Sequence, residues 1–156
     1  MKASDIMTKK VKTIRKDATF KELWKLITMG HINALPVVDG RQKLIGIVTK
    51  EDVLFKLYPD YQEFFESVTS SDETLPSDRD VSDILKIRVE KVMKRNVIFA
   101  RPETSVMRIL ARMLARHVDQ IPIVSSSGCI VGLITKSDIF YSLYKFHKDL
   151  LSFKKK

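Results

Sequence analysis

The sequence is an internal duplication. When the 156-residue chain is shifted against itself by 86 positions, residues 1–52 fall on residues 87–138 without a gap, and ten of these 52 pairs are identical. Unrelated sequences would share roughly three residues over this length. The identical pairs are Met7/Met93, Val11/Val97, Arg15/Arg101, His31/His117, Pro36/Pro122, Val38/Val124, Gly46/Gly132, Thr49/Thr135, Lys50/Lys136 and Asp52/Asp138. A unit this small buries too little apolar surface alone, so we expect the copies to pack against each other.

Each copy has the pattern of a β-α-β-β-α unit. Short extended runs at 11–14 and 97–100 come first, and apolar residues at helical spacing follow from 19 and from 105. Two short apolar runs come next in each copy, at 35–38 and 44–48 and at 121–124 and 130–134. A turn-rich segment separates the runs, which predicts hairpins. Final helices are predicted from 49 and from 135. The fold class is therefore α/β (α+β).

The first helix of each copy should begin with a different cap. Thr19 and Glu22 have the spacing of a capping box, whereas Ser105 is followed by Arg108 in the place of the glutamate. We therefore expect the weaker cap in the second copy. Trp24 falls at the helical spacing of the apolar positions, which predicts a core residue rather than a stacking platform.

The segment between the copies has a different composition. Residues 58–65 are rich in aromatic side chains mixed with polar ones, which predicts an extension of the preceding helix, and residues 67–80 are polar, as in a surface loop. We divide the chain into a first repeat at 1–57, a linker at 58–88, a second repeat at 89–146 and a basic tail at 147–156.

Composition and charge exclude several classes of protein. The longest apolar runs are far shorter than the ~20 residues of a spanning helix, and the N-terminus has no secretory pattern. The single cysteine, Cys129, cannot form an intrachain disulfide, so we expect a soluble cytoplasmic protein. The net charge is +9, divided as +5 over 1–54, −4 over 55–88 and +8 over 89–156. This spread favours a field for anionic ligands over a nucleic-acid surface.

The segment with the clearest binding chemistry occurs twice, from Gly46 to Asp52 and from Gly132 to Asp138. A glycine in a strand lets a ligand or a backbone approach closely. Thr49 and Thr135 stand at helix N-caps, where N–H groups favour a phosphate. An aspartate one turn later can accept hydrogen bonds from a ribose diol. The same pattern also serves as a capping box without any ligand. The shared Lys50 and Lys136 have no capping role, which favours the binding interpretation.

These motifs resemble a tandem pair of cystathionine-β-synthase (CBS) domains, a Bateman module. The resemblance covers about residues 3–54 and 89–140 and rests on the repeat, on Leu35-Pro36-Val37-Val38 and Ile121-Pro122-Ile123-Val124, and on the two endings described above. It implies two β-α-β-β-α repeats packed with pseudo-twofold symmetry. It also implies two clefts between them that bind AMP, ADP, ATP, S-adenosylmethionine or a related molecule.

The resemblance also assigns residues to these clefts. It implies that Asp52 and Asp138 bind ribose and that Thr49 and Thr135 lie beside the phosphate. Backbone at 32–35 and 118–121 would border the adenine. The full set of expected ligand-binding residues is Thr13, Ile32, Ala34, Leu35, Pro36, Thr49, Lys50, Asp52, Val118, Gln120, Ile121, Pro122, Thr135, Lys136 and Asp138.

The chain departs from the family where members that bind polyphosphates carry His or Arg. Those places hold Asn33-Ala34 and Asp119-Gln120 here. We therefore expect AMP to bind at least as tightly as ATP, and the cleft beside Asp119 to be the weaker for phosphorylated ligands because of its charge. For His31 and His117 we weigh a phosphate contact against a locally satisfied helix end and favour the second.

The sequence leaves three functions open. No catalytic, P-loop or metal-ligand motif is present, so an enzyme is not expected, nor a catalytic cofactor. We favour a regulatory module that senses an adenosine-containing ligand and acts on an unidentified protein partner. The alternatives are a structural dimerisation module with empty clefts and, less favoured, a nucleic-acid-binding protein. A homodimer is expected, with apolar segments 64–65 and 140–143 as candidate contacts.

Overall fold

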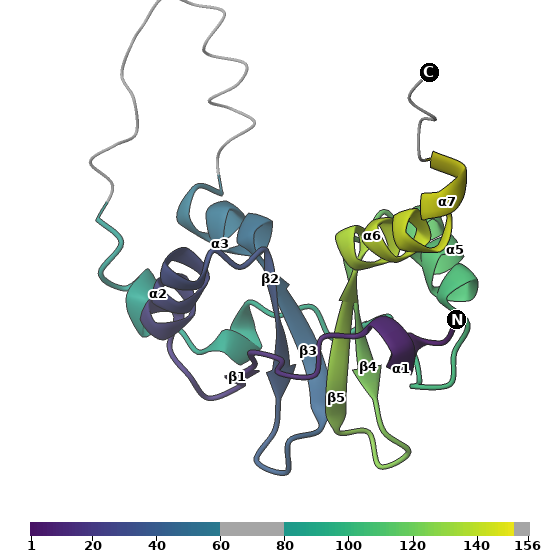
Figure 1. Cartoon of the computed structure of the whole chain (residues 1–156). Coiled ribbons are helices and arrows are strands. Elements are labelled where there is room, and N and C mark those ends of the chain that lie inside the picture. Colours follow the sequence, from purple (N-terminus) through teal and green to yellow (C-terminus); the bar gives the residue numbers. More distant parts are fainter. Residues whose placement is uncertain (60–79, 152–156) are drawn as a thin grey trace, which may run out of the picture. The chain divides into compact units, whose positions relative to one another are not determined.

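The computed structural model describes residues 1–59 and 80–151 (Figure 1). Along the chain, the part before residue 60 contains α1 (Ala3–Ile6), β1 (Ile14–Arg15), α2 (Phe20–Gly30), β2 (Ala34–Val38), β3 (Leu44–Thr49) and α3 (Lys50–Leu57). The part after residue 79 contains the 3-10 helices η1 (Ile84–Lys86) and η2 (Val89–Lys91), then α5 (Val106–Arg116), β4 (Gln120–Val124), β5 (Ile130–Thr135), α6 (Lys136–Phe146) and α7 (Lys148–Leu151). The predicted α/β class is confirmed.

The chain forms two compact units that exchange their first segments. One unit, which we call the Asp52 unit, consists of Thr13–Gly40 and Ile45–Val97. The other, the Asp138 unit, consists of Met1–Lys12, Arg41–Leu44 and Ile98–Lys156. The start of the first repeat thus lies with the sheet of the second repeat, and the start of the second repeat lies with the sheet of the first.

Backbone hydrogen bonds fix both exchanged segments. Lys94 and Ile47 donate to each other's carbonyl oxygens, at 2.8 and 2.9 Å, and Thr8 and Leu133 do the same at 2.9 and 3.0 Å. The two pairs are equivalent under the 86-residue shift. Residues 8 and 94 therefore occupy matching places beside the two site-bearing strands.

The Asp52 unit contains a three-stranded sheet in the order β1-β2-β3, with β1 parallel to β2 and Ile14 opposite Val37. Figure 1 shows α3 continuing from the end of β3. The core is aliphatic and aromatic, and its members include Phe20, Leu23, Ile27, Leu35, Val37, Val48, Val53 and Leu57. Burial of this face of α2 and of both faces of β2 (all five of whose residues are buried) holds β3 and the start of α3 in place.

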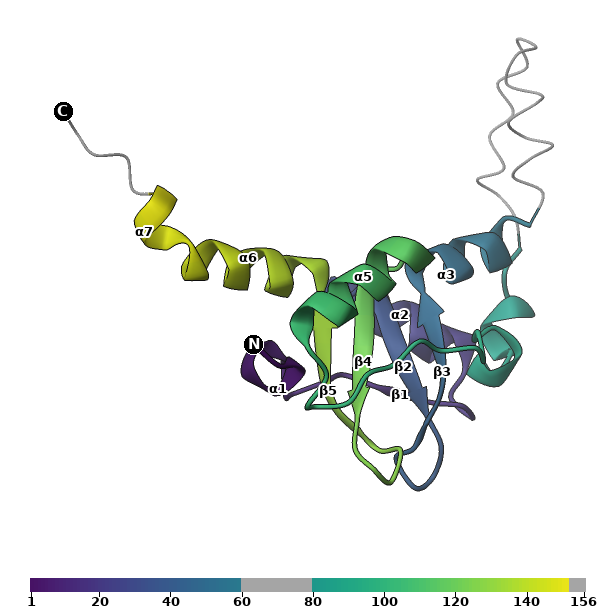
Figure 2. The ribbon, with the colours of Figure 1, turned by 90° about the vertical axis from the view of Figure 1, so that its right-hand side faces the viewer.

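The Asp138 unit is built on the antiparallel pair β4-β5, with Ile121 opposite Ile134 and a shift of register between Ile123 and Val124. Its core includes Ile109, Met113, Ile121, Ile123, Ile134 and Ile139. Figure 2 shows α6 and α7 extending away from the β4-β5 pair. Ser105 caps α5 without a side-chain hydrogen bond, which confirms the weaker cap.

Three local predictions differ from the structure. The first strands are shorter than expected, because β1 covers Ile14–Arg15 and the segment 97–100 contributes one bridge, from Ala100 to Ile123. The core position of Trp24 is wrong: its side chain is 36% exposed, since Phe20, Leu23 and Ile27 already fill the buried stripe of α2. Helix α3 ends at Leu57, and most of the aromatic segment lies outside the described residues.

Among the described residues, no helix combines the length and the apolar character needed to cross a membrane.

Candidate ligand-binding site

The repeated motif forms a capping box at the start of α3 and of α6. In the first copy, Oδ2 of Asp52 accepts hydrogen bonds from the backbone N–H of Thr49 at 2.8 Å and from its hydroxyl at 2.9 Å. The hydroxyl of Thr49 accepts in turn from the N–H of Asp52 at 3.2 Å. In the second copy the same three bonds join Thr135 and Asp138, at 2.8, 2.7 and 3.1 Å. The two sites therefore have the same local geometry.

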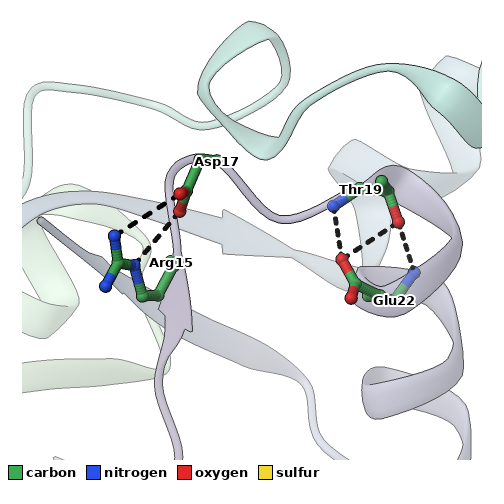
Figure 3. Close-up of polar contacts among 4 residues, drawn as sticks. All are labelled: Arg15, Asp17, Thr19 and Glu22. Atoms are coloured by element: carbon green, nitrogen blue, oxygen red, sulfur yellow. Dashed lines mark hydrogen bonds and ion pairs between the residues drawn. The ribbon is translucent and has the colours of Figure 1, made fainter. Parts of the chain in front are cut away.

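A third capping box shows what this geometry does without a ligand. Thr19 and Glu22 make the same set of bonds at the start of α2, at 2.7, 3.1 and 3.3 Å (Figure 3). The backbone N–H of Thr19, and then its hydroxyl, hold the pKa of Glu22 below its ordinary value. Capping thus accounts for the threonine and for one carboxylate oxygen in every box. It leaves the second oxygen outside the box in all three, but Glu22 is exposed, whereas Asp52 and Asp138 are partly buried.

The second carboxylate oxygen has different surroundings in the two copies. Oδ1 of Asp52 lies 3.0 Å from Nζ of Lys94, and the Asp52 side chain is only 9% exposed, while that of Lys94 is 61% exposed. For Asp138, residues 1–59 and 80–151 provide no partner for Oδ1. The matching place of Lys94 is held by Thr8 in the Asp138 unit. Asp52 is therefore an ion-paired carboxylate and Asp138 is a partly buried one with an available oxygen.

The helix N-termini are partly satisfied within the protein. The N–H of Lys50 donates to the carbonyl of Asn33 at 2.8 Å, and the N–H of Lys136 to that of Asp119 at 2.9 Å. The third amide of each helix is bonded to the capping threonine. The sequence pattern suggested free amides here, but these two are hydrogen-bonded within the protein. An anion at this place would therefore depend more on side chains than on the backbone.

The charge of Asp119 is balanced. Nζ of Lys136 lies 2.9 Å from Oδ1 of Asp119, whose side chain is 81% exposed. The lysine of the motif turns toward Asp119 and offsets its charge, and the expectation that the cleft beside Asp119 is the weaker one stays a prediction. In the first copy Asn33 stands in the place of Asp119, and Lys50 has no ion pair among the described residues.

The remaining predicted site residues divide into buried and half-buried ones. The side chains of Ala34, Leu35, Pro36, Ile121 and Pro122 are buried, and those of Leu35 and Ile121 belong to the two cores. Four side chains are half-buried. Ile32 and Val118 lie just before β2 and β4, Gln120 begins β4, and Thr13 precedes β1. A planar ligand at this edge would thus contact mainly backbone and small apolar surface.

The two shared histidines have a backbone role. His31 and His117 end α2 and α5 in the left-handed conformation, with φ of 50° and 52°, and both are exposed. Their N–H groups donate to carbonyls of the last helical turn. Histidine is one of the residues that tolerate this conformation, which supports the local interpretation.

No group of three or more His, Cys, Asp or Glu side chains in the described part of the chain could hold a metal ion. Cys129 is half-buried, and its Sγ donates to the carbonyl of Arg41 at 3.6 Å.

Comparison of the sequence with protein families identifies the family of the two copies. A model described as CBS domain matches residues 3–58 and 89–145, which are the two copies. The chain belongs to the CBS domain family. The family model confirms the resemblance inferred from the motifs and the tandem arrangement of the two domains.

Two curated relatives match this chain over part of their own length. The chain is 29% identical over 138 residues to an inosine-5'-monophosphate dehydrogenase of Methanocaldococcus jannaschii, covering 88% of this chain and 23% of that protein. It is 24% identical over 143 residues to a homoserine O-acetyltransferase of Methanohalobium evestigatum, covering 92% of this chain and 24% of that protein. The chain thus spans about a quarter of the length of these relatives.

Solved CBS domain pairs share the fold. The CBS domain pair of protein MJ0100, in complex with 5'-methylthioadenosine and S-adenosyl-L-methionine, superposes with a TM-score of 0.69 at 24% identity, covering 94% of this chain and 98% of that one. CBSX2 in complex with AMP gives a TM-score of 0.72 at 17% identity, covering 93% and 97%. At these identities the likeness concerns the fold.

Sequence reasoning missed the residues that the exchanged segments bring to this CBS domain pair. Lys94 reaches Asp52, and the side chains of Met93 and Met7 lie against Gly46 and Gly132. The close approach that these glycines permit is thus made by the protein itself. The signal was present in the repeat, because Met7 matches Met93 and Thr8 replaces Lys94, but the shift alone does not reveal that the segments are exchanged.

Proposed function

We propose that this CBS domain pair is a regulatory module that binds an adenosine-containing ligand at Asp52 and at Asp138, with the ribose diol as the group recognised. The observation that carries the proposal is that the two oxygens of each carboxylate have different roles. Oδ2 is fixed by the capping box, and Oδ1 lies outside it. A fixed, poorly hydrated carboxylate oxygen is a strong acceptor for a hydroxyl group. The second oxygen of Glu22 also lies outside its box, but that side chain is exposed, whereas Asp52 and Asp138 are partly buried.

Features of the other predicted residues agree with this proposal. The half-buried Ile32 and Val118 offer apolar surface for an adenine beside each strand start. We propose that Thr49, Thr135, Lys50 and Lys136 lie beside a phosphate. Solved CBS domain pairs in complex with AMP, or with 5'-methylthioadenosine and S-adenosyl-L-methionine, provide the chemical class of ligand to test.

The proposed output is regulation of another protein or of an attached domain. The relatives named above are enzymes of which the matched pair forms about a quarter. The chain would accordingly act by binding its ligand and changing its contacts with a protein partner, not by catalysing a reaction. A homodimer is proposed as the form that does so.

Mass spectrometry of small molecules released from the purified protein, followed by calorimetric titration with the compounds found, tests the function. The panel is AMP, ADP, ATP, S-adenosylmethionine and 5'-methylthioadenosine, with GMP as the base control. We expect adenosine compounds to bind, GMP to fail, and AMP to bind at least as tightly as ATP. Folded protein that binds none of the panel at millimolar concentration would favour the structural dimerisation module. Salt-dependent retention on DNA or RNA would favour a nucleic-acid-binding protein.

A further inference from the structure

Asp52 and Asp138 have different neighbours, because the exchanged segments supply a different side chain at each of them. Lys94 and Thr8 occupy matching backbone positions, each pairing in both directions with the residue two places before the capping threonine, Ile47 or Leu133. From this place Lys94 reaches Oδ1 of Asp52 at 3.0 Å. Threonine is too short and carries no charge, so within residues 1–59 and 80–151 Asp138 has no equivalent cation.

The ion pair between Lys94 and Asp52 affects any ligand whose ribose binds to Asp52. A diol that donates to Oδ1 must share or displace the ammonium group of Lys94. Because the Asp52 side chain is 9% exposed, solvent screens this interaction less than at an open surface. A displaced ammonium group loses this ion pair, and another anion close by would offset that loss. A 5'-phosphate can supply one, because Lys94 lies beside the N-terminus of α3, where the phosphate is proposed to bind.

We propose that Lys94 makes the Asp52 site selective for adenosine ligands with an anionic 5' group, whereas the Asp138 site, which has Thr8 instead, accepts ligands without one. This inference rests on the proposed function and deepens it. AMP would satisfy Lys94 at the Asp52 site. Adenosine and 5'-methylthioadenosine would leave the ammonium group without a counter-charge, and the sulfonium of S-adenosylmethionine would be disfavoured beside it. At the Asp138 site these penalties do not arise.

A second difference between the copies acts in the same direction. Lys136 of the Asp138 unit is paired with Asp119 at 2.9 Å, whereas Lys50 of the Asp52 unit lies beside the uncharged Asn33. A phosphate therefore meets an uncommitted lysine in one unit and a paired one in the other. Glu51, exposed on α3 next to Lys50, offsets part of this difference. The contact of Lys94 is for this reason the decisive one.

The test exchanges the two residues and measures discrimination between AMP and adenosine. Calorimetric titrations are run on Lys94→Thr, on Thr8→Lys and on the double exchange. Each is also run with Asp52→Asn or Asp138→Asn so that one site is read at a time. In the wild type we expect AMP to be preferred over adenosine by about tenfold or more at the Asp52 site and only weakly at the Asp138 site. Lys94→Thr should abolish the preference at the first site, and Thr8→Lys should create one at the second.

The control is Lys91→Thr, which removes the same charge from an exposed position on η2. Lys94→Gln, which keeps much of the side-chain length, guards against a loss of fold and should behave as Lys94→Thr does. If Lys94→Thr keeps the wild-type ratio of AMP to adenosine affinity while both sites still bind, the inference is overturned and the proposed function stands. If neither ligand binds at either site of the folded wild type, the proposed function itself fails, and the inference with it.

Discussion

The side chain of Met93 lies so close to Gly46 that a Cβ atom on residue 46 would overlap its sulfur. The carbonyl oxygen of Lys94 would also lie 3.1 Å from that Cβ. Met7 approaches Gly132 in the same manner in the other unit. Each exchanged segment thus packs against the backbone at the glycine of the repeated motif.

This contact predicts that Gly46→Ala destabilises the protein by about 1–3 kcal/mol, the usual cost of overpacking. Urea unfolding followed by circular dichroism measures it. Gly40→Ala is the matched control, because Gly40 is not at positive φ and the nearest atom to its added Cβ, on Arg15, is 3.8 Å away. Adding Met93→Ala to Gly46→Ala should cost less than the two single changes added together. An equal effect of Gly46→Ala and Gly40→Ala would refute the tight packing.

The third capping box predicts a specific pH dependence. The pKa of Glu22 is lowered by its bonds from Thr19, so these bonds stabilise the protein above the ordinary pKa of a glutamate, and this stabilisation is lost as the pH falls through the lowered value. Glu22→Gln should therefore lose less in Tm than the wild type between about pH 6 and about pH 3. Differential scanning calorimetry measures both curves. Parallel curves for the two proteins would show that the bond to the carboxylate contributes nothing.

The exposed side chains of α6 favour association into a dimer. Phe140 is 78% exposed, Tyr141 62% and Tyr144 51%, and such an apolar patch is typical of a contact surface. Light scattering should give about twice 18.0 kDa for the wild type at micromolar concentration, and a lower mass for Phe140→Glu. Met29→Glu changes a side chain of similar exposure, 74%, on α2 and should leave the mass unchanged. A wild type that remains at 18.0 kDa would contradict the dimer.

The ion pair of Asp119 gives a prediction for the second site. Asp119→Asn should release Lys136 and strengthen AMP binding at the Asp138 site by up to about tenfold, without changing the Asp52 site. Asn33→Asp should weaken AMP binding at the Asp52 site, because it introduces the same pairing for Lys50. Asp83→Asn, an exposed aspartate on the turn before η1, is the control for net charge. Calorimetry that finds Asp119→Asn indistinguishable from Asp83→Asn would exclude this role of the pair.

Local patterns predicted local structure well. Thr19 with Glu22, Thr49 with Asp52 and Thr135 with Asp138 form the expected caps, because a capping box depends only on residues three apart. Trp24 was misplaced because helical spacing does not show how wide the buried stripe is.

Contacts between distant segments could not be predicted in this way. The approach of Lys94 to Asp52 depends on which sheet receives the segment before residue 98, and no spacing within one repeat contains that information. For Lys136 and Asp119 the sequence positions predict proximity, but they do not predict that the lysine turns toward the aspartate.

AMP titration of the double variant Asp52→Asn with Asp138→Asn, beside Glu22→Gln, tests directly whether the two carboxylates bind the ligand. Asparagine keeps an oxygen for each cap and removes the second carboxylate oxygen, so the helix starts are preserved while the diol acceptor is lost. We predict that the double variant loses AMP binding by about a hundredfold or more, as expected when two charge-assisted bonds are removed. Glu22→Gln should bind as the wild type does. A folded double variant that binds AMP with wild-type affinity would show that these carboxylates only cap their helices.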